Sequence, residues 1–364
     1  MSGSIETNSG RKSGTIGAKV AGPTVSASDP TITTNATLGT QWANSSSGEF
    51  FILTDATTDA NVWTNVGSGS GDIEPYTFQG TVSGYTSGGN GGSDTNIIDK
   101  FSFTSDGNAS DVGDLTVSLK NGVGHSSSTH GYMAGGNTSA GFHDEINKFS
   151  LTSDGNATDI GNLTLGRAFM YSGASSANHG YSTGGYPSDS TNRNIIDKHS
   201  FSSDGDATDV GDLTVARSVH AGQSSSTHGY SSGGDGPQNV IDKYPFASDS
   251  NATDVGDLSV SRGYMPGQSS TNHGYTSGGE TSSNVNTVDK FTFASDANAT
   301  DVGDLTVARR VPASQSSTNH GYTSGGYVSS YTNVIDKYTF ASDANATDVG
   351  DLSVSRYSPA GQQH

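Results

Sequence analysis

The chain has 364 residues, of which 50 are glycine, 15 tyrosine and 13 phenylalanine, none is cysteine, and only 30% are hydrophobic. Its 17 Lys and Arg residues against 36 Asp and Glu residues give a formal net charge of −19, which disfavours nucleic acid and anionic membranes as partners. The lack of cysteine excludes disulfides, thiolate metal sites and cysteine nucleophiles. Without a long apolar run or a charged-then-apolar N-terminus, the sequence predicts neither membrane insertion nor secretion, so synthesis in a cytoplasm is expected.

Residues 1–33 are rich in Ser, Thr and Gly and show no hydrophobic period. Such a composition cannot bury enough apolar surface to offset the entropy of ordering. We therefore expect a flexible arm, or a docking arm that orders only on a partner.

Residues 34–75 differ from the arm because they contain both tryptophans of the chain, Trp42 and Trp63. The stretch predicts a small three-stranded β meander whose apolar cluster includes Trp42, Phe50, Phe51 and Trp63. A core of this size is marginal by itself, so we expect the module to need a partner surface.

The order of motifs in this module is distinctive: a Trp is followed by GE and apolar residues, then by TDAT and by NVWTNVG. In this order the stretch resembles a short module near the N-termini of bacteriophage tail-fibre and other virion proteins. The resemblance implies a virion protein whose N-terminal region attaches to other virion proteins. The candidate attachment residues are Trp42, Phe50, Phe51 and Trp63.

From residue 76 onward the sequence is a tandem repeat in which a diglycine recurs every 45 to 49 residues. The six copies are Gly88-Gly89, Gly135-Gly136, Gly184-Gly185, Gly233-Gly234, Gly278-Gly279 and Gly325-Gly326. Segments such as IDKYTF and ASDANATDVGDLSVSR follow each copy, with apolar and polar residues alternating between turn-forming stretches. Each unit therefore predicts four short antiparallel strands, which is typical of a β-propeller blade.

The units resemble kelch repeats, because GYTSGG carries a diglycine after the second strand and DKYTF an aromatic residue in the third. They depart from kelch repeats at DVGDL, which stands where a tryptophan is expected, so the resemblance is to a divergent kelch-like family. The repeat region begins with a second strand and ends at SPAGQQH, which matches a first strand. We therefore expect residues 76–364 to form a six-bladed, all-β propeller closed by pairing of its N- and C-terminal strands.

The two faces of such a propeller differ in sequence variability. The turns STNHG and SDANAT, which lie on one face, are nearly constant, whereas the loops after each diglycine and the links between units differ from copy to copy. Because loops on a rigid scaffold commonly carry recognition, the variable face is the predicted binding surface. The candidate contacts are Phe169, Tyr171, Tyr186, Arg193, Tyr264, Tyr327, Tyr331 and Tyr357. The alternative is that these loops vary because nothing constrains them.

Two polar patterns on the constant face could hold metal, and each also has a structural interpretation. Histidines recur before GY at His130, His179, His228, His273 and His320; a ring of imidazoles could bind metal or respond to pH, or each could belong to its own hairpin turn. The SDGNATD turns carry Asp and Asn at alternating positions, as in Ca²⁺ loops, but turn chemistry alone accounts for them. We predict no metal and no cofactor.

Two further charged patterns recur with the repeat. An Asp-Lys pair recurs in the third strand, and five units end in arginine (Arg167, Arg217, Arg262, Arg309, Arg356), whereas the first unit has Leu119 in that place. Neighbouring strand residues point to opposite faces, so we expect these charges to connect adjacent blades.

The sequence favours a non-enzymatic structural protein of a phage virion, a tail fibre or tip that binds a host-surface glycan or protein through the variable face. Homo-oligomerisation is left open. The alternative is a capsid or tail decoration protein with a stabilising role. A glycan-cleaving propeller is disfavoured because the acidic residues of the variable loops are scattered and no arginine cluster faces them.

Overall fold

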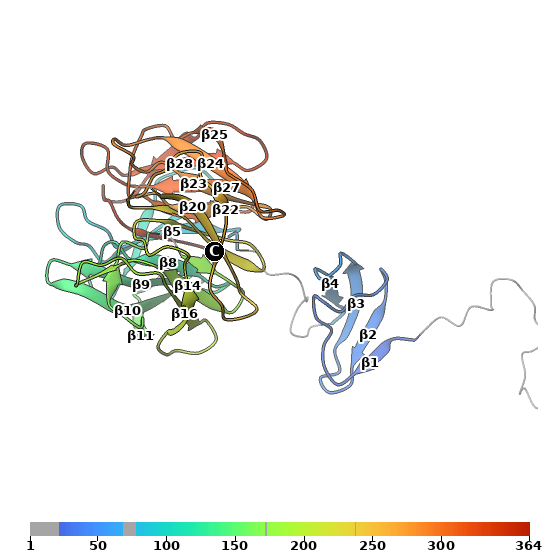
Figure 1. Ribbon diagram of the computed structural model, residues 1–364. Coiled ribbons are helices and arrows are strands. Elements are labelled where there is room, and N and C mark those ends of the chain that lie inside the picture. Colours follow the sequence, from blue (N-terminus) through green and yellow to red (C-terminus); the bar gives the residue numbers. More distant parts are fainter. Residues whose placement is uncertain (1–21, 68–77, 172, 237) are drawn as a thin grey trace, which may run out of the picture. The chain divides into compact units, whose positions relative to one another are not determined.

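The computed structural model describes residues 22–67, 78–171, 173–236 and 238–364 (Figure 1). Within these residues every regular element is a β-strand, which confirms the all-β prediction, and no helix that could span a membrane is found there. The chain divides into two compact units, Met1–Pro75 and Tyr76–His364.

The described part of the smaller unit is one four-stranded sheet. Its strands, in order across the sheet, are β1 (Thr24–Ser26), β2 (Gln41–Asn44), β3 (Phe50–Asp55) and β4 (Val62–Asn65). Phe51, Leu53 and Trp63 are fully buried, and Trp42 packs edge-on against Trp63 with ring centroids 5.9 Å apart. Because Phe51 and Trp63 are inside this core, only Trp42 and Phe50 among the four candidate attachment residues remain partly exposed.

The sheet begins earlier in the chain than predicted and has one more strand. We predicted three strands beginning after residue 33, but β1 adds a fourth strand that pairs in parallel with β2. The Trp42 indole N–H donates to the carbonyl of Ser28 at 2.9 Å, and the Asn44 amide donates to Asp29 at 2.7 Å. These contacts attach the last part of the expected arm to the sheet; residues 1–21 lie outside the described residues.

The larger unit contains six four-stranded antiparallel sheets among its described residues, numbered here in chain order of their third strands (Figure 1). Sheet 1 holds β30 (Ala360–Gln363), β5 (Ser83–Ser87), β6 (Ile97–Ser102) and β7 (Ser110–Asp114). Sheet 2 holds β8 (Val123–Ser126), β9 (His130–Thr138), β10 (Gly141–Ser150) and β11 (Thr158–Asn162). Sheet 3 holds β13 (Ala174–Ser175), β14 (His179–Thr183), β16 (Ile195–Ser200) and β17 (Thr208–Asp212).

The remaining sheets follow the same pattern. Sheet 4 holds β18 (Ala221–Ser224), β19 (His228–Gly234), β20 (Gln238–Pro245) and β21 (Thr253–Asp257). Sheet 5 holds β22 (Gly267–Ser269), β23 (His273–Ser277), β24 (Thr287–Thr292) and β25 (Thr300–Asp304). Sheet 6 holds β26 (Ala313–Ser316), β27 (His320–Ser324), β28 (Val334–Thr339) and β29 (Thr347–Asp351). A two-stranded ladder joins β12 (Arg167–Ala168) to β15 (Tyr186–Pro187).

The first strands of the six sheets lie next to one another in a propeller-like arrangement. Strand β8 neighbours β13, and contacts continue through β18, β22 and β26 to β30, which also neighbours β8. The C-terminal strand β30 pairs antiparallel with β5, so sheet 1 joins the two ends of this unit. At the point of closest approach only glycine fits, because a Cβ atom added to Gly361 would lie 1.9 Å from the carbonyl oxygen of Ser314.

Aromatic side chains fill the space between neighbouring sheets. Tyr181 of sheet 3 stacks on Phe246, which directly follows β20 of sheet 4, with ring centroids 4.8 Å apart. The equivalent tyrosines of other sheets repeat this contact. Each stacked pair belongs to a separate small core, so the apolar residues are distributed among several inter-sheet clusters.

Buried ion pairs connect neighbouring sheets, as the recurring Asp and Arg residues suggested. Asp289 of β24 accepts hydrogen bonds from Arg262 at 2.8 Å and from the backbone N–H and hydroxyl of Ser259 at 3.0 and 2.6 Å. The five equivalent pairs are Arg167–Asp197, Arg217–Asp242, Arg262–Asp289, Arg309–Asp336 and Arg356–Asp99. Between sheets 1 and 2 both members are uncharged, because Leu119 replaces the arginine and Asn147 replaces the aspartate.

The lysine next to each of these acidic or amide residues makes a second connection between sheets. The six partly exposed pairs are Lys100–Asp154, Lys148–Asp204, Lys198–Asp249, Lys243–Asp296, Lys290–Asp343 and Lys337–Asp106. Surface ion pairs of this kind contribute little each, so the buried pairs carry more of the inter-sheet specificity.

The uncharged pair Leu119 and Asn147 between sheets 1 and 2 provides a test of the buried ion pairs. Arg262→Leu leaves the Asp289 carboxylate buried without its cation, which we expect to lower the free energy of unfolding by about 3 to 5 kcal/mol. The double variant Arg262→Leu/Asp289→Asn reproduces the combination of Leu119 and Asn147 and should recover most of that loss. Urea denaturation measures both variants; a double variant as unstable as the single one would contradict this account.

Candidate ligand-binding pocket

Six structurally equivalent residues in the links between sheets adopt left-handed backbone conformations. They are Asn121, Phe169, Val219, Tyr264, Val311 and Ser358, with φ between 52° and 63°. A positive φ is uncommon for any residue with a side chain and is a true outlier for a β-branched one such as Val219 or Val311. The surrounding structure must therefore hold these residues in place.

A continuous series of backbone hydrogen bonds provides that restraint. The N–H of Phe169 donates to the carbonyl of Asn121 at 2.7 Å, and the N–H of Val219 donates to that of Phe169 at 2.6 Å. The series continues through Tyr264, Val311 and Ser358 at 2.7 to 2.8 Å, and the N–H of Asn121 donates to the carbonyl of Ser358 at 3.0 Å. We call these six residues the link ring. It fixes the backbone without using any side chain.

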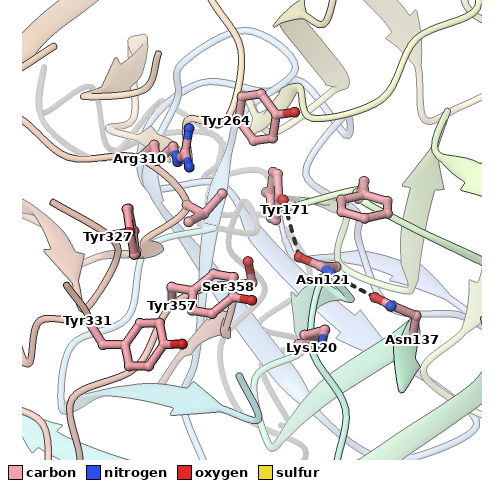
Figure 2. Close-up of a pocket in the computed structure, with 12 residues that line it drawn as sticks. Lys120, Asn121, Asn137, Tyr171, Tyr264, Arg310, Tyr327, Tyr331, Tyr357 and Ser358 are labelled. Atoms are coloured by element: carbon pink, nitrogen blue, oxygen red, sulfur yellow. Dashed lines mark hydrogen bonds between the residues drawn. The ribbon is translucent and has the colours of Figure 1, made fainter. Parts of the chain in front are cut away.

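A pocket of about 370 Å³ lies over the link ring (Figure 2). Its twelve lining residues include six of the eight contacts predicted from sequence: Phe169, Tyr171, Tyr264, Tyr327, Tyr331 and Tyr357. The other two candidates, Tyr186 and Arg193, are not among these lining residues. Tyr186 packs edge-on against Phe169 at 6.0 Å without lining the pocket, and Arg193 pairs with Asp189 on the same loop.

Short backbone bridges bring the diglycine loops to the links. Tyr327, directly after a diglycine, exchanges backbone hydrogen bonds of 2.9 and 3.1 Å with Arg310, and Asn90 does the same with Tyr357 at 2.9 and 3.0 Å. The stacked rings of Tyr331 and Tyr357, 5.2 Å apart, are thereby placed on one side of the pocket. Variable residues from distant repeats thus converge because the backbone pattern of each repeat is the same.

Two cationic side chains complete the pocket wall, and sequence analysis missed both as site residues. The Arg310 guanidinium lies over the rings of Tyr327 and Tyr264, at 5.2 and 5.9 Å from their centroids, and pairs with Glu280 at 2.5 Å. Lys120 pairs with Asp94 at 2.8 Å. Both occupy the position before a link-ring residue, and this shared position is the signal that would have identified them.

Polar groups at the base of the pocket are arranged around Tyr171. The link between sheets 2 and 3 is one residue longer than the others, and Tyr171 is buried within it. Its hydroxyl donates to the side-chain oxygen of Asn121 at 3.2 Å, and the Asn121 amide donates to Asn137 at 2.7 Å. Burial raises the pKa of Tyr171 far above its ordinary value, so the phenol stays neutral and able to donate.

A second, wider pocket of about 500 Å³ adjoins the first and shares Tyr264 with it. Its lining includes the acidic side chains Asp235 and Glu280 together with Thr281 and Ser282. Its only cation, Arg262, is buried in the ion pair with Asp289. The two neighbouring pockets therefore differ in charge.

The recurring histidines are part of their hairpins. The backbone N–H of His320 donates to the Ser317 hydroxyl at 3.0 Å, and the carbonyl of His320 accepts from the N–H of Ser317 at 2.8 Å. The serine, rather than the imidazole, closes the turn. Among the described residues no three His, Asp or Glu side chains are grouped closely enough to hold a metal ion.

Three other histidines are fully buried near the first strands. Burial lowers the pKa of His125 to about 4, and burial together with Arg217 and Arg167 lowers that of His220 to about 3. His199 packs on His125 with ring centroids 4.9 Å apart, and burial holds its pKa well below the ordinary value. Most other sheets carry glutamine at the position of His125, as in Gln268, and an aromatic residue at the position of His199, as in Phe291.

No protein-family model matches the chain, and no curated protein matches it either. The site is therefore interpreted from its own geometry.

The buried histidines should make the protein sensitive to acid. Their pKa is lower in the folded than in the unfolded chain, so the unfolded state binds more protons below pH 6.5 and stability falls as the pH decreases. His125 alone contributes a loss on the order of 3 kcal/mol by pH 4. We expect His125→Gln/His199→Phe to narrow the difference in urea midpoint between pH 7 and pH 4.5. The control His273→Gln, on a histidine whose pKa partial burial also lowers, should narrow that difference less. An unchanged difference in the double variant would contradict this assignment.

Proposed function

We propose that the chain is a non-enzymatic adhesin of a bacteriophage virion, a tail-fibre or tip component that binds a host-surface glycan. In this proposal the six sheets are the blades of one closed, divergent kelch-like propeller. The neighbour order of the first strands and the return of the link-ring hydrogen bonds to their starting residue support closure.

The observation that carries the proposal is the aromatic pocket over the link ring. A pyranose sugar has a face of C–H groups bordered by hydroxyls, so it is complementary to aromatic faces beside amide and hydroxyl groups. The pocket offers both, in the rings of Tyr331 and Tyr357 and in the side chains of Asn121 and Asn137. Its residues are variable among repeats while its backbone is constant, which is the arrangement expected of a recognition surface.

The acidic residues near the pocket support binding rather than catalysis. Partial burial would raise the pKa of Asp94, but hydrogen bonds from Lys120 and Asn90 hold it below its ordinary value. Glu280 is paired with Arg310. A glycosidase needs one carboxyl group that keeps its proton near neutral pH, and a carboxylate held by a cation is unsuited to that role.

The smaller unit provides the virion end of the proposal. Its resemblance to an N-terminal module of phage virion proteins implies attachment to other virion proteins, and the partly exposed Trp42 and Phe50 are its candidate contacts. In the particle, the larger unit would then present the pocket toward the host.

We predict that Tyr327→Ala/Tyr331→Ala in the full chain weakens binding to intact bacteria by at least about tenfold, because truncating aromatic contacts in a binding pocket costs upwards of 1.4 kcal/mol. Fluorescently labelled protein and flow cytometry over a panel of bacterial strains measure the effect. Val215→Ala/Val307→Ala removes two exposed apolar side chains outside the pocket and serves as the control. If the folded wild-type protein binds none of the strains, the adhesin proposal fails and the decoration role replaces it.

A further inference from the structure

The charged groups that line the aromatic pocket are unusual for this chain. Although the formal net charge is −19, the only charged side chains among the pocket's lining residues are the cations Lys120 and Arg310. Their partners Asp94 and Glu280 are outside that lining. A ligand in the pocket therefore meets positive charge at its surface.

Arg310 is held in position for a planar anion. Its guanidinium is fixed between the rings of Tyr264 and Tyr327, and one of its Nη atoms donates to Glu280. A guanidinium carries five N–H donors, so this contact leaves donors for a ligand. The fork geometry of arginine matches a carboxylate better than a hydroxyl, and prior immobilisation by the two rings reduces the entropy lost on binding.

Lys120 provides a second positive group across the pocket. Figure 2 shows it on the side opposite Arg310, beside Asn121 and Asn137. Its ammonium has three donors, one of which is used by Asp94. In this view Tyr357 and Ser358 lie between the two cations.

We propose that the pocket selects an acidic glycan, with the carboxylate of a sugar unit bound by Arg310 and its ring packed on the tyrosines. The inference rests on the proposed glycan-binding function and adds the charge class of the ligand. The adjoining pocket, lined by Asp235 and Glu280, repels a second carboxylate and so accommodates a neutral unit of the same chain. The ligand is thus an oligosaccharide that combines acidic and neutral sugars.

The test is equilibrium binding of the full chain to an array of bacterial polysaccharide fragments and to pairs of glycans that differ only in a carboxylate. The pairs are trigalacturonic acid and sialyllactose, each with its own methyl ester. We expect at least one acidic member to bind about tenfold or more tightly than its neutral partner, as a charge-assisted contact provides.

Variants separate the contribution of the Arg310 charge to binding from the contribution of the other pocket residues. Arg310→Gln should reduce the acidic preference to near parity, and Arg310→Lys should keep part of it. Arg193→Gln removes a cation from the variable face outside the pocket and should leave the acidic preference unchanged. Tyr331→Ala should weaken acidic and neutral members alike. Thermal melting checks that each variant is folded.

The outcomes distinguish the two proposals. Neutral members that bind as tightly as their acidic partners, or a preference that survives Arg310→Gln, would overturn the inference and leave the glycan-binding function intact. No binding to any glycan of the array would overturn the proposed function and the inference with it.

Discussion

The larger unit depends on a buried aspartate in the third strand of five of its six sheets, replaced in sheet 2 by Asn147, which fixes the position of the preceding sheet. In a chain with so few apolar residues, contact between sheets cannot rely on a large hydrophobic core. The two oxygens of Asp289 accept from Arg262 and from both polar groups of Ser259, so a shift of one residue would leave a buried charge unpaired. Because the contact repeats, the links occupy equivalent positions in successive sheets. The link ring and the pocket above it depend on that equivalence.

Much of this architecture could be predicted because the repeat makes each signal visible several times. The alternating residues and turns identified the strands, and the recurring Asp and Arg suggested connections between sheets. Strand β1 could not be predicted, since it is only three residues long and lies in a segment of polar composition that shows no alternating pattern. The joint loss of charge at Leu119 and Asn147 could not be predicted either, because the sequence does not show that these two positions form a pair.

The pocket was only partly predictable for a different reason. Aromatic residues on the variable face were natural candidates, and most of them do gather. Their convergence depends on left-handed backbone at Phe169 and Tyr264, which local sequence does not indicate for residues with large side chains. Arg310 and Lys120 were missed because a lone cation in a loop looks like any solvated charge, and only the rings and the empty volume beside it give it a role.

The link ring has one consequence for how this surface can change over time. Its six members are Asn, Phe, Val, Tyr, Val and Ser, and main-chain atoms alone hold them in their shared conformation. The hydrogen-bond series itself uses no side chain, so exchanging the partly exposed Phe169 and Tyr264 changes the surface of the pocket while the backbone series is kept. Val219 and Val311 also pack in a buried cluster, and Asn121 bonds Tyr171 and Asn137. Duplication or recombination of whole repeats would shuffle these positions while preserving the frame, which makes the ring a natural template for diversification and for laboratory libraries aimed at new ligands.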